Sequence, residues 1–262
     1  VDPRARNVAR LSGVDVASSA VDAVTGASTV LVAVRDHDDL LEVLDGAGGV
    51  RPHLAAGTVL GVLMAVGVDE IRELAVGLGE ASVHVLDAPV SGGGELARRG
   101  EIACLVGAPT TVVDSVRNVL HQLAATVIMA GEAVGDGQAM KAVNQLVAAV
   151  NLLGVAEALS LASALGLDPA TALRALASGA AGSFMASDRG PRMVEAASGV
   201  APTLVNRIDL TAQELSVALG IARDYGVATP VGAAAEQVFL RAARRIDPDA
   251  DDSEIVRIVE SD

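Results

Sequence analysis

The chain has 262 residues, of which 51% are hydrophobic, enough for the core of one large domain or of two smaller ones. Its net charge of −14 and near-lack of aromatic residues argue against a nucleic-acid partner, because neither a basic surface nor a base-stacking platform is available. The longest apolar stretch contains Asn151 and Glu157 and is typical of a buried helix rather than of a membrane span. The composition therefore predicts a cytoplasmic protein that does not contact membranes.

Short β-branched runs alternate with amphipathic stretches in the first half of the chain. We expect strands at residues 29–34, 58–66, 82–86, 102–106 and 126–129. We expect helices at residues 37–44, 68–78 and 110–123. This alternation predicts βαβ units and a largely parallel sheet, with mixed pairing among the later strands.

The second half of the chain has helical patterns and no strong strand signal. A helix is predicted from Asp136 to about Leu165, and its apolar residues lie on nearly every face, so we expect it to be covered on all sides. Further helices are predicted at residues 169–176, 209–224, 230–245 and 253–259. The acidic run 247–254 is expected to be a solvated turn. The pattern predicts an α/β domain over residues 1–132 and a helical domain over 133–262.

Lys141 is the only lysine beside 18 arginines. Arginine stays protonated near neutral pH, whereas a lysine can exchange a proton once burial lowers its pKa. Asn144 lies three residues further along, on the same helix face, and Gly135 and Gly137 leave room for a ligand near the first turn. The arrangement favours an acid/base role for Lys141, the alternative being a lysine left by compositional drift.

A glycine-rich segment follows the predicted strand 82–86. Ser91, Gly92 and Gly93 can direct several backbone N–H groups at one point and form a nest for a carboxylate, although a flexible turn has the same composition. Combined with Lys141, the segment fits an anionic hydroxy acid: the nest holds the carboxylate, and the hydroxyl lies between Lys141 and Asn144.

Two motifs carry a resemblance to a known family. The segment LDAPVSGG at 86–93 and the spacing GxGxxxKxxN at 135–144 resemble the substrate-binding and catalytic motifs of the β-hydroxyacid dehydrogenases, typified by 3-hydroxyisobutyrate dehydrogenase. The resemblance implies an NAD(P)-dependent oxidoreductase that interconverts a small 3-hydroxy acid and its semialdehyde or keto acid, with Lys141 as general acid/base. The substrate-binding residues it implies are Ser91, Gly92, Gly93 and Asn144.

The resemblance also implies an architecture. It consists of a Rossmann-type N-terminal domain, a long interdomain helix and an all-α C-terminal domain, in a homodimer or homotetramer. The family begins with a strand, a G-x-G-x-x-G turn and a helix, and we expect this first βα unit to lie outside the 262 residues.

The positions expected to bind the cofactor match the family's usual residues less closely than the positions expected to bind the substrate. Asp2 falls where an acidic residue binds the adenosine ribose, which slightly favours NAD over NADP, although Arg4 and Arg6 could meet a 2′-phosphate. Val34 and Arg35 stand where the family commonly has Leu-Pro after a strand.

Two further positions on the cofactor side depart from the family. Met64 and Ala65 replace the usual Ser-Thr. Gln213 replaces a lysine that approaches the nicotinamide. These departures leave open a non-catalytic relative that acts as a binding protein.

Other readings of the sequence are weaker. An imine reductase shares the implied fold but generally lacks a lysine at position 141, and a 6-phosphogluconate dehydrogenase would have a histidine within 143–145. No metal site is expected, because the four histidines show neither metal-ligand spacing nor grouping. Cys104 is expected to be a buried strand thiol.

Overall fold

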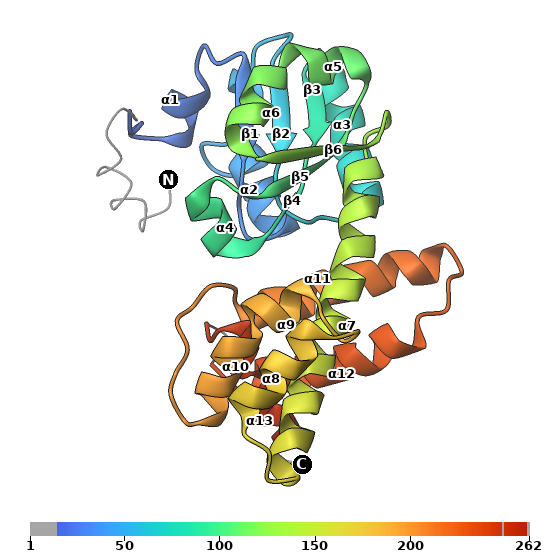
Figure 1. Cartoon of the computed structure of the whole chain (residues 1–262). Coiled ribbons are helices and arrows are strands. Elements are labelled where there is room, and N and C mark those ends of the chain that lie inside the picture. Colours follow the sequence, from blue (N-terminus) through green and yellow to red (C-terminus); the bar gives the residue numbers. More distant parts are fainter. Residues whose placement is uncertain (1–14, 248, 261–262) are drawn as a thin grey trace. The chain divides into compact units, whose positions relative to one another are not determined.

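A computed structural model describes residues 15–247 and 249–260 (Figure 1). Contacts within the chain divide it into two compact units. Unit 1 comprises the described residues up to Ser91 together with 100–141, and unit 2 comprises 92–99 together with the described residues from Ala142 onward. Each unit is described below by itself.

Unit 1 is built on a six-stranded sheet. Its strands are β1 (Thr29–Val32), β2 (Val59–Val62), β3 (His84–Asp87), β4 (Val90–Ser91), β5 (Ala103–Gly107) and β6 (Thr126–Gly131). β1, β2 and β3 are parallel, with Thr29 beside Val59 and Val59 beside His84. β5 runs antiparallel to β3 and β4 and parallel to β6, so the prediction of a parallel sheet with mixed pairing among the later strands is confirmed.

β3 and β4 lie end to end along one side of β5. Asp87 pairs with Gly107, Val90 with Cys104, and the Leu105 N–H donates to the Pro89 carbonyl at 2.9 Å. The segment between the two strands is therefore held in an extended conformation against β5, and it leads directly into the glycine-rich segment.

Helices connect the strands of unit 1. They are α1 (Ala20–Val24), α2 (His37–Asp45), α3 (Val68–Gly79), α5 (Thr110–Ser115) and α6 (Arg117–Leu123), with a short 3-10 turn, η2 (Arg51–His53). The single helix predicted over 110–123 is wrong, because Val116 adopts φ −116° and ψ 12° and its buried side chain separates α5 from α6. The core is aliphatic and includes the fully buried Leu40, Leu44, Leu60 and Ile71.

Unit 2 is helical. It contains α4 (Gly93–Arg99), most of α7 (Asp136–Ala164), α8 (Pro169–Ser178), α9 (Phe184–Asp188), α10 (Gly190–Ala197), α11 (Ile208–Asp224), α12 (Pro230–Arg245), η3 (Asp252–Glu254) and α13 (Ile255–Glu260). Its described residues form no strand apart from an isolated bridge between Arg207 and Asp251. The core surrounds Phe239 and includes Leu152, Ala156 and Leu159 of α7.

Helix α7 has one buried and one exposed apolar face. By length and composition alone it could cross a membrane, with a mean hydropathy of 1.8, but its middle turns belong to the core of unit 2. An exposed stripe runs along the opposite face through Val143, Val147, Gly154 and Leu161. The expectation that all faces are covered is therefore not met within one chain.

Candidate functional site

Asp87, the last residue of β3, caps the N-terminus of α7. Its Oδ2 accepts hydrogen bonds from the backbone N–H groups of Gly135, at 2.9 Å, and of Gln138, at 3.1 Å. Burial raises the pKa of the Asp87 carboxyl to about 6, while the N–H donors act in the opposite direction. A carboxylate in this position satisfies N–H groups that have no partner within the helix, so it fixes the start of α7 to the sheet.

Two glycines allow α7 to approach the sheet backbone. A Cβ on Gly137 would lie 2.7 Å from the Leu105 carbonyl oxygen and 2.9 Å from Cγ of Asp87. A Cβ on Gly107 would lie 2.4 Å from the Gly137 nitrogen. Neither position has space for a side chain, so the first turn of α7 rests directly on β3 and β5.

Gln138 connects the same turn to the loop after β2. Its Oε1 accepts from the Val66 N–H at 3.0 Å, and its Nε2 donates to the Met64 carbonyl at 3.0 Å. The side chain is almost fully buried, so both of its polar ends are used where water is excluded.

Lys141 lies one turn after Gln138 and is also buried, with 6% of its surface exposed. Its Nζ donates a hydrogen bond to the Val90 carbonyl at 3.0 Å. Because Val90 directly precedes Ser91, the ammonium group lies where the glycine-rich segment begins. The structure therefore brings two separately predicted motifs, Lys141 and the start of the Ser91–Gly93 segment, next to each other.

The glycine-rich segment has a backbone that other residues rarely adopt. Gly92 has φ +131° and Gly93 has φ +75°, both in the region that favours glycine. Ser91 ends β4 and Gly93 begins α4, so the segment is a tight turn between a strand and a short helix, where a flexible loop was an open alternative.

Asn144, the other predicted substrate ligand, is exposed on α7. Its Nδ2 donates to Oε1 of Gln145 at 2.9 Å, and Gln145 donates in turn to Glu214 of α11. Gln213, next to Glu214, is exposed. Within unit 2, Asn144, Gln145 and Glu214 form a polar group that joins α7 to α11.

Two of the four predicted cofactor residues lie just beyond the end of a parallel strand. Val34 and Arg35 follow β1, and Arg35 forms ion pairs with Asp36 at 3.0 Å and with Asp39 at 3.2 Å. Asp2 lies outside the described residues. Dinucleotides bind beyond the carboxyl ends of strands in open α/β sheets. β1 and β2 are parallel neighbours, so their carboxyl ends are adjacent and form an edge of the kind at which a dinucleotide binds.

Met64 and Ala65 follow β2 at the same edge of the sheet. Both are half-buried, and Gln138 holds the Met64 carbonyl and the neighbouring Val66 N–H. The loop that would face the nicotinamide is thus attached to the first turn of α7 through buried hydrogen bonds.

A buried polar network in unit 2 contradicts one expectation. The run 247–254 is not a solvated turn throughout, because its second half, from Asp251 to Glu254, is buried. Asp251 accepts from the Val205 N–H at 2.7 Å and pairs with Arg192 at 3.2 Å. The acidic pattern alone did not reveal these partners, since Arg192 lies on α10, far away in the sequence.

The second aspartate of this run pairs with another arginine. Asp252 lies 3.3 Å from Nε of Arg189 and accepts from Asn206 at 2.9 Å and from Thr211 at 3.2 Å. Burial raises the pKa of Asp252 to about 6. Burial acts on Asp251 in the same direction, but the Ser253 hydroxyl, the Val205 N–H and Arg192 hold its pKa below the ordinary value.

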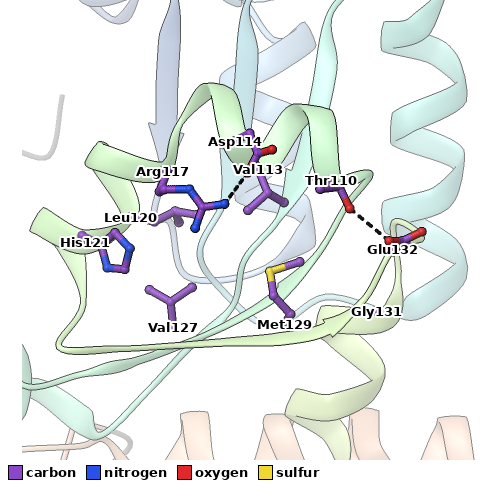
Figure 2. Close-up of a pocket in the computed structure, with 10 residues that line it drawn as sticks. All are labelled: Thr110, Val113, Asp114, Arg117, Leu120, His121, Val127, Met129, Gly131 and Glu132. Carbon is purple, nitrogen blue, oxygen red and sulfur yellow. Dashed lines mark hydrogen bonds and ion pairs between the residues drawn. The ribbon is translucent and has the colours of Figure 1, made fainter.

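One cavity of unit 1 contains none of the predicted site residues in its lining. A cavity of about 300 Å³ lies beside β6 (Figure 2) and is lined by Thr110, Val113, Asp114, Arg117, Leu120, His121, Val127, Met129, Gly131 and Glu132. Four of its polar residues pair with each other, Arg117 with Asp114 and Thr110 with Glu132. Within the described residues, no cluster of His, Cys, Asp and Glu could hold a metal ion.

Cys104 lies in β5, fully buried, as predicted. Its thiol donates to the Ala88 carbonyl at 3.4 Å, and burial, with the nearby charge of Asp87, raises the pKa of the thiol to about 12. It is therefore an inert core residue.

Sequence reasoning did not single out two residues that organise the start of α7, Asp87 and Gln138. Asp87 appeared only as part of the LDAPVSGG motif, and Gln138 was not singled out at all. Their partners lie 48 to 74 residues away, so local spacing gave no signal. The position of Asp87 at the end of a buried strand was the one available indication.

Comparisons with known proteins agree with this geometry. Residues 2–131 match the family described as the NAD binding domain of 6-phosphogluconate dehydrogenase, and residues 135–259 match the NAD-binding family of NADP-dependent 3-hydroxyisobutyrate dehydrogenase. The chain is 30% identical to L-threonate dehydrogenase of Cupriavidus necator over 87% of its own length and 76% of that protein. It is 31% identical to 2-hydroxy-3-oxopropionate reductase of Escherichia coli over 90% and 80% of the two chains.

A solved structure extends the similarity to the fold. The structure of Mycobacterium tuberculosis 3-hydroxyisobutyrate dehydrogenase with L-serine superposes with a TM-score of 0.82 at 26% identity. The match covers 98% of this chain and 87% of the other.

Proposed function

Because the chain belongs to the β-hydroxyacid dehydrogenase family and is an NAD(P)-dependent oxidoreductase of small hydroxy acids, we propose that Lys141 is its general acid/base. One observation carries the assignment: the buried Nζ lies 3.0 Å from the Val90 carbonyl, at the start of the Ser91–Gly93 segment. The proposed reaction interconverts a 3-hydroxy acid and its semialdehyde or keto acid.

Lys141 moves the proton in this proposal. In oxidation, neutral Nζ takes the hydroxyl proton while hydride leaves the carbinol carbon, so the C–O bond becomes a carbonyl. In reduction, the ammonium group polarises the carbonyl and returns the proton. The Val90 carbonyl accepts a hydrogen bond from Nζ and keeps the amine in place for either direction.

The substrate carboxylate is proposed to bind at Ser91, Gly92 and Gly93. The positive φ values of the two glycines place the segment in a tight turn, and successive backbone N–H groups of a turn can converge on an anion. Asn144, three residues after Lys141 on α7, is proposed to donate to the substrate hydroxyl.

The cofactor is proposed to bind at the carboxyl edge of β1 and β2, near Val34, Arg35, Met64 and Ala65, with Asp2 on the adenosine side and Gln213 near the nicotinamide. A bound nicotinamide supplies or accepts the hydride. We propose NAD in preference to NADP because Asp2 is acidic, and an acidic residue there suits an unphosphorylated ribose.

The test follows the absorbance of reduced nicotinamide across a panel of small 3-hydroxy acids, with NAD and with NADP. Lys141→Met is expected to lower turnover by roughly 10²- to 10⁴-fold while cofactor affinity stays near that of the unmodified protein. Lys141→Arg is the matched control, because it keeps the charge without exchanging a proton, and it is expected to be equally inactive.

The outcomes separate the alternatives. Cofactor binding without turnover of any hydroxy acid would identify a non-catalytic relative. Reduction of cyclic imines without hydroxy acid turnover would identify an imine reductase. Equal loss of turnover and of cofactor affinity in Lys141→Met would make the lysine a cofactor ligand.

We further propose that the protein is a cytoplasmic homo-oligomer without membrane or nucleic-acid partners. The exposed stripe through Val143, Val147, Gly154 and Leu161 of α7 supports a second copy, because a small residue between large apolar ones lets two helices approach closely. The membership of the middle turns of α7 in the core of unit 2 supports a helix outside the membrane.

A further inference from the structure

Arg189 is a buried cation within unit 2. Only 4% of its surface is exposed, and a buried guanidinium is costly unless its charge is paired. Its Nη1 donates to Asp188, and its Nε lies 3.3 Å from Asp252. Two edges of the guanidinium therefore face carboxylates.

The remaining edge faces the glycine-rich segment. A Cβ on Gly93 would lie 3.1 Å from Nη2 of Arg189 and 3.7 Å from Nη1. The guanidinium thus packs against the backbone of Gly93, on the side where any other residue would place its side chain. Phe184 lies against it as well, with its ring centroid 5.9 Å from the guanidinium carbon.

We propose that Arg189 is a positioning and specificity-determining residue, which holds the Gly92–Gly93 backbone in its anion-binding form and makes the segment select a carboxylate over a neutral group. This inference rests on the proposed substrate site. Asp188 and Asp252 orient the guanidinium through Nη1 and Nε, and its positive charge lies against the Gly93 backbone, where it favours an anion.

The proposal explains why an arginine occupies this position. A lysine has a single ammonium group and cannot meet Asp188 and Asp252 on two edges while it presents a third to Gly93. It also gives a role to the buried segment 251–254, called here the tail. Asp252 of this tail accepts hydrogen bonds from Asn206 and Thr211, and its carboxylate in turn holds Arg189 in position.

The experiment compares an acid with its uncharged counterpart. KM and kcat are measured for 3-hydroxypropionate and for methyl 3-hydroxypropionate with Arg189→Met and with Arg189→Lys. Arg189→Met is expected to raise KM for the acid by on the order of tenfold or more, with a much smaller change for the ester. Arg189→Lys is expected to fall between this variant and the unmodified protein.

The matched control is Arg192→Met. Arg192 belongs to the same network, pairing with Asp188 and Asp251, but Nη2 and Nη1 of Arg189 are the network atoms that lie against Gly93. If Arg189→Met does not fold, the double variant with Asp252→Asn removes the carboxylate left without its arginine. Equal loss for acid and ester, or the same selective loss in Arg192→Met, would overturn the proposal.

A binding measurement distinguishes failure of this inference from failure of the proposed function. The backbone amide resonances of Gly92 and Gly93 are followed by NMR during titration with 3-hydroxypropionate and with 1,3-propanediol. The acid alone is expected to shift them, and Arg189→Met is expected to weaken that response. An unchanged response in the variant rejects the role of Arg189 even if no substrate is turned over, while absence of turnover alone bears on the proposed function.

Discussion

Asp87 and Gly135 are joined by a 2.9 Å hydrogen bond that links the end of β3 to the start of α7. Val90, three residues after Asp87, accepts a hydrogen bond from Lys141, six residues after Gly135. The two contacts fasten the same extended segment to the same helix at two points. The position of the Lys141 amine is therefore determined by the sheet as well as by its own helix.

Asp87 should make stability depend on pH. Its pKa is about 6 in the folded protein against an ordinary 3.8, so the folded state binds this proton more tightly. Its contribution to the free energy of unfolding then decreases as pH rises from 3.8 to about 6, by about 3 kcal/mol in total. Asp87→Asn cannot ionise and should show a shallower decrease, measured by urea unfolding across this range.

A control for this measurement is Asp69→Asn, at an exposed carboxyl on α3. Cys104, the titratable neighbour of Asp87, has a pKa of about 12 and does not ionise in this range. Identical pH slopes for Asp87→Asn and the unmodified protein would contradict the prediction.

Gly137→Ala should destabilise unit 1. The added methyl group would meet the Leu105 carbonyl at 2.7 Å and Asp87 at 2.9 Å, and neither backbone can move without disturbing the sheet. We expect a loss of about 1–3 kcal/mol in the free energy of unfolding, together with reduced kcat, since Lys141 follows on the same helix. Gly79→Ala, where nothing lies within 4 Å of the new methyl, should leave stability unchanged or slightly raised.

Asp251→Ala should be strongly destabilising. The substitution leaves the N–H groups of Val205 and Asn206 without their acceptor and removes the partner of Arg192. Breaking a buried charged pair in this way costs about 3–5 kcal/mol, to be measured by urea unfolding.

The comparison variant is Asp249→Ala, at a carboxyl that pairs with Arg207 on the surface and is 59% exposed. An exposed pair contributes about 0–1 kcal/mol, so this variant should be nearly neutral. Equal effects at the two positions would mean that the tail is not a buried structural element.

If two copies associate through α7 as proposed, Val147→Glu should weaken that association. Val147 is 55% exposed in the stripe along α7, and a carboxylate there would have to be desolvated in an interface between two copies. Sedimentation velocity should show a shift toward monomer. Val76→Glu, at a 72% exposed valine on α3, is the matched control and should not change the assembly. Identical sedimentation of both variants would exclude this face.

Local sequence patterns predicted those helices whose first or last turn contains a residue that favours a helix end. The helix predicted at 230–245 has those bounds in the structure, because Pro230 is favoured in the first helical turn. The break at Val116 was not predicted, because it depends on how the Val116 side chain packs in the core. Helix α4 was not predicted, because it begins with two glycines, which are poor helix formers.

The site was predictable as a set of residues but not as an arrangement. Lys141 and the Ser91–Gly93 segment stood out by composition and resemblance. Their connection passes through Asp87 and the Val90 carbonyl, and a backbone acceptor has no signature in the sequence. Arg189 is one of eighteen arginines, and no sequence feature sets it apart from the others. Its burial and its contact with Gly93 are seen only in the structure.

The contact between Gly107 and Gly137 has a consequence for how this enzyme can be altered. Both sides of this contact are backbone atoms, and a side chain at either glycine would clash with the other strand or helix. Single substitutions therefore cannot change the distance between α7 and the sheet in small steps. Lys141 follows Gly137 on the same helix, so the position of the amine proposed to transfer the proton depends on this contact between backbones.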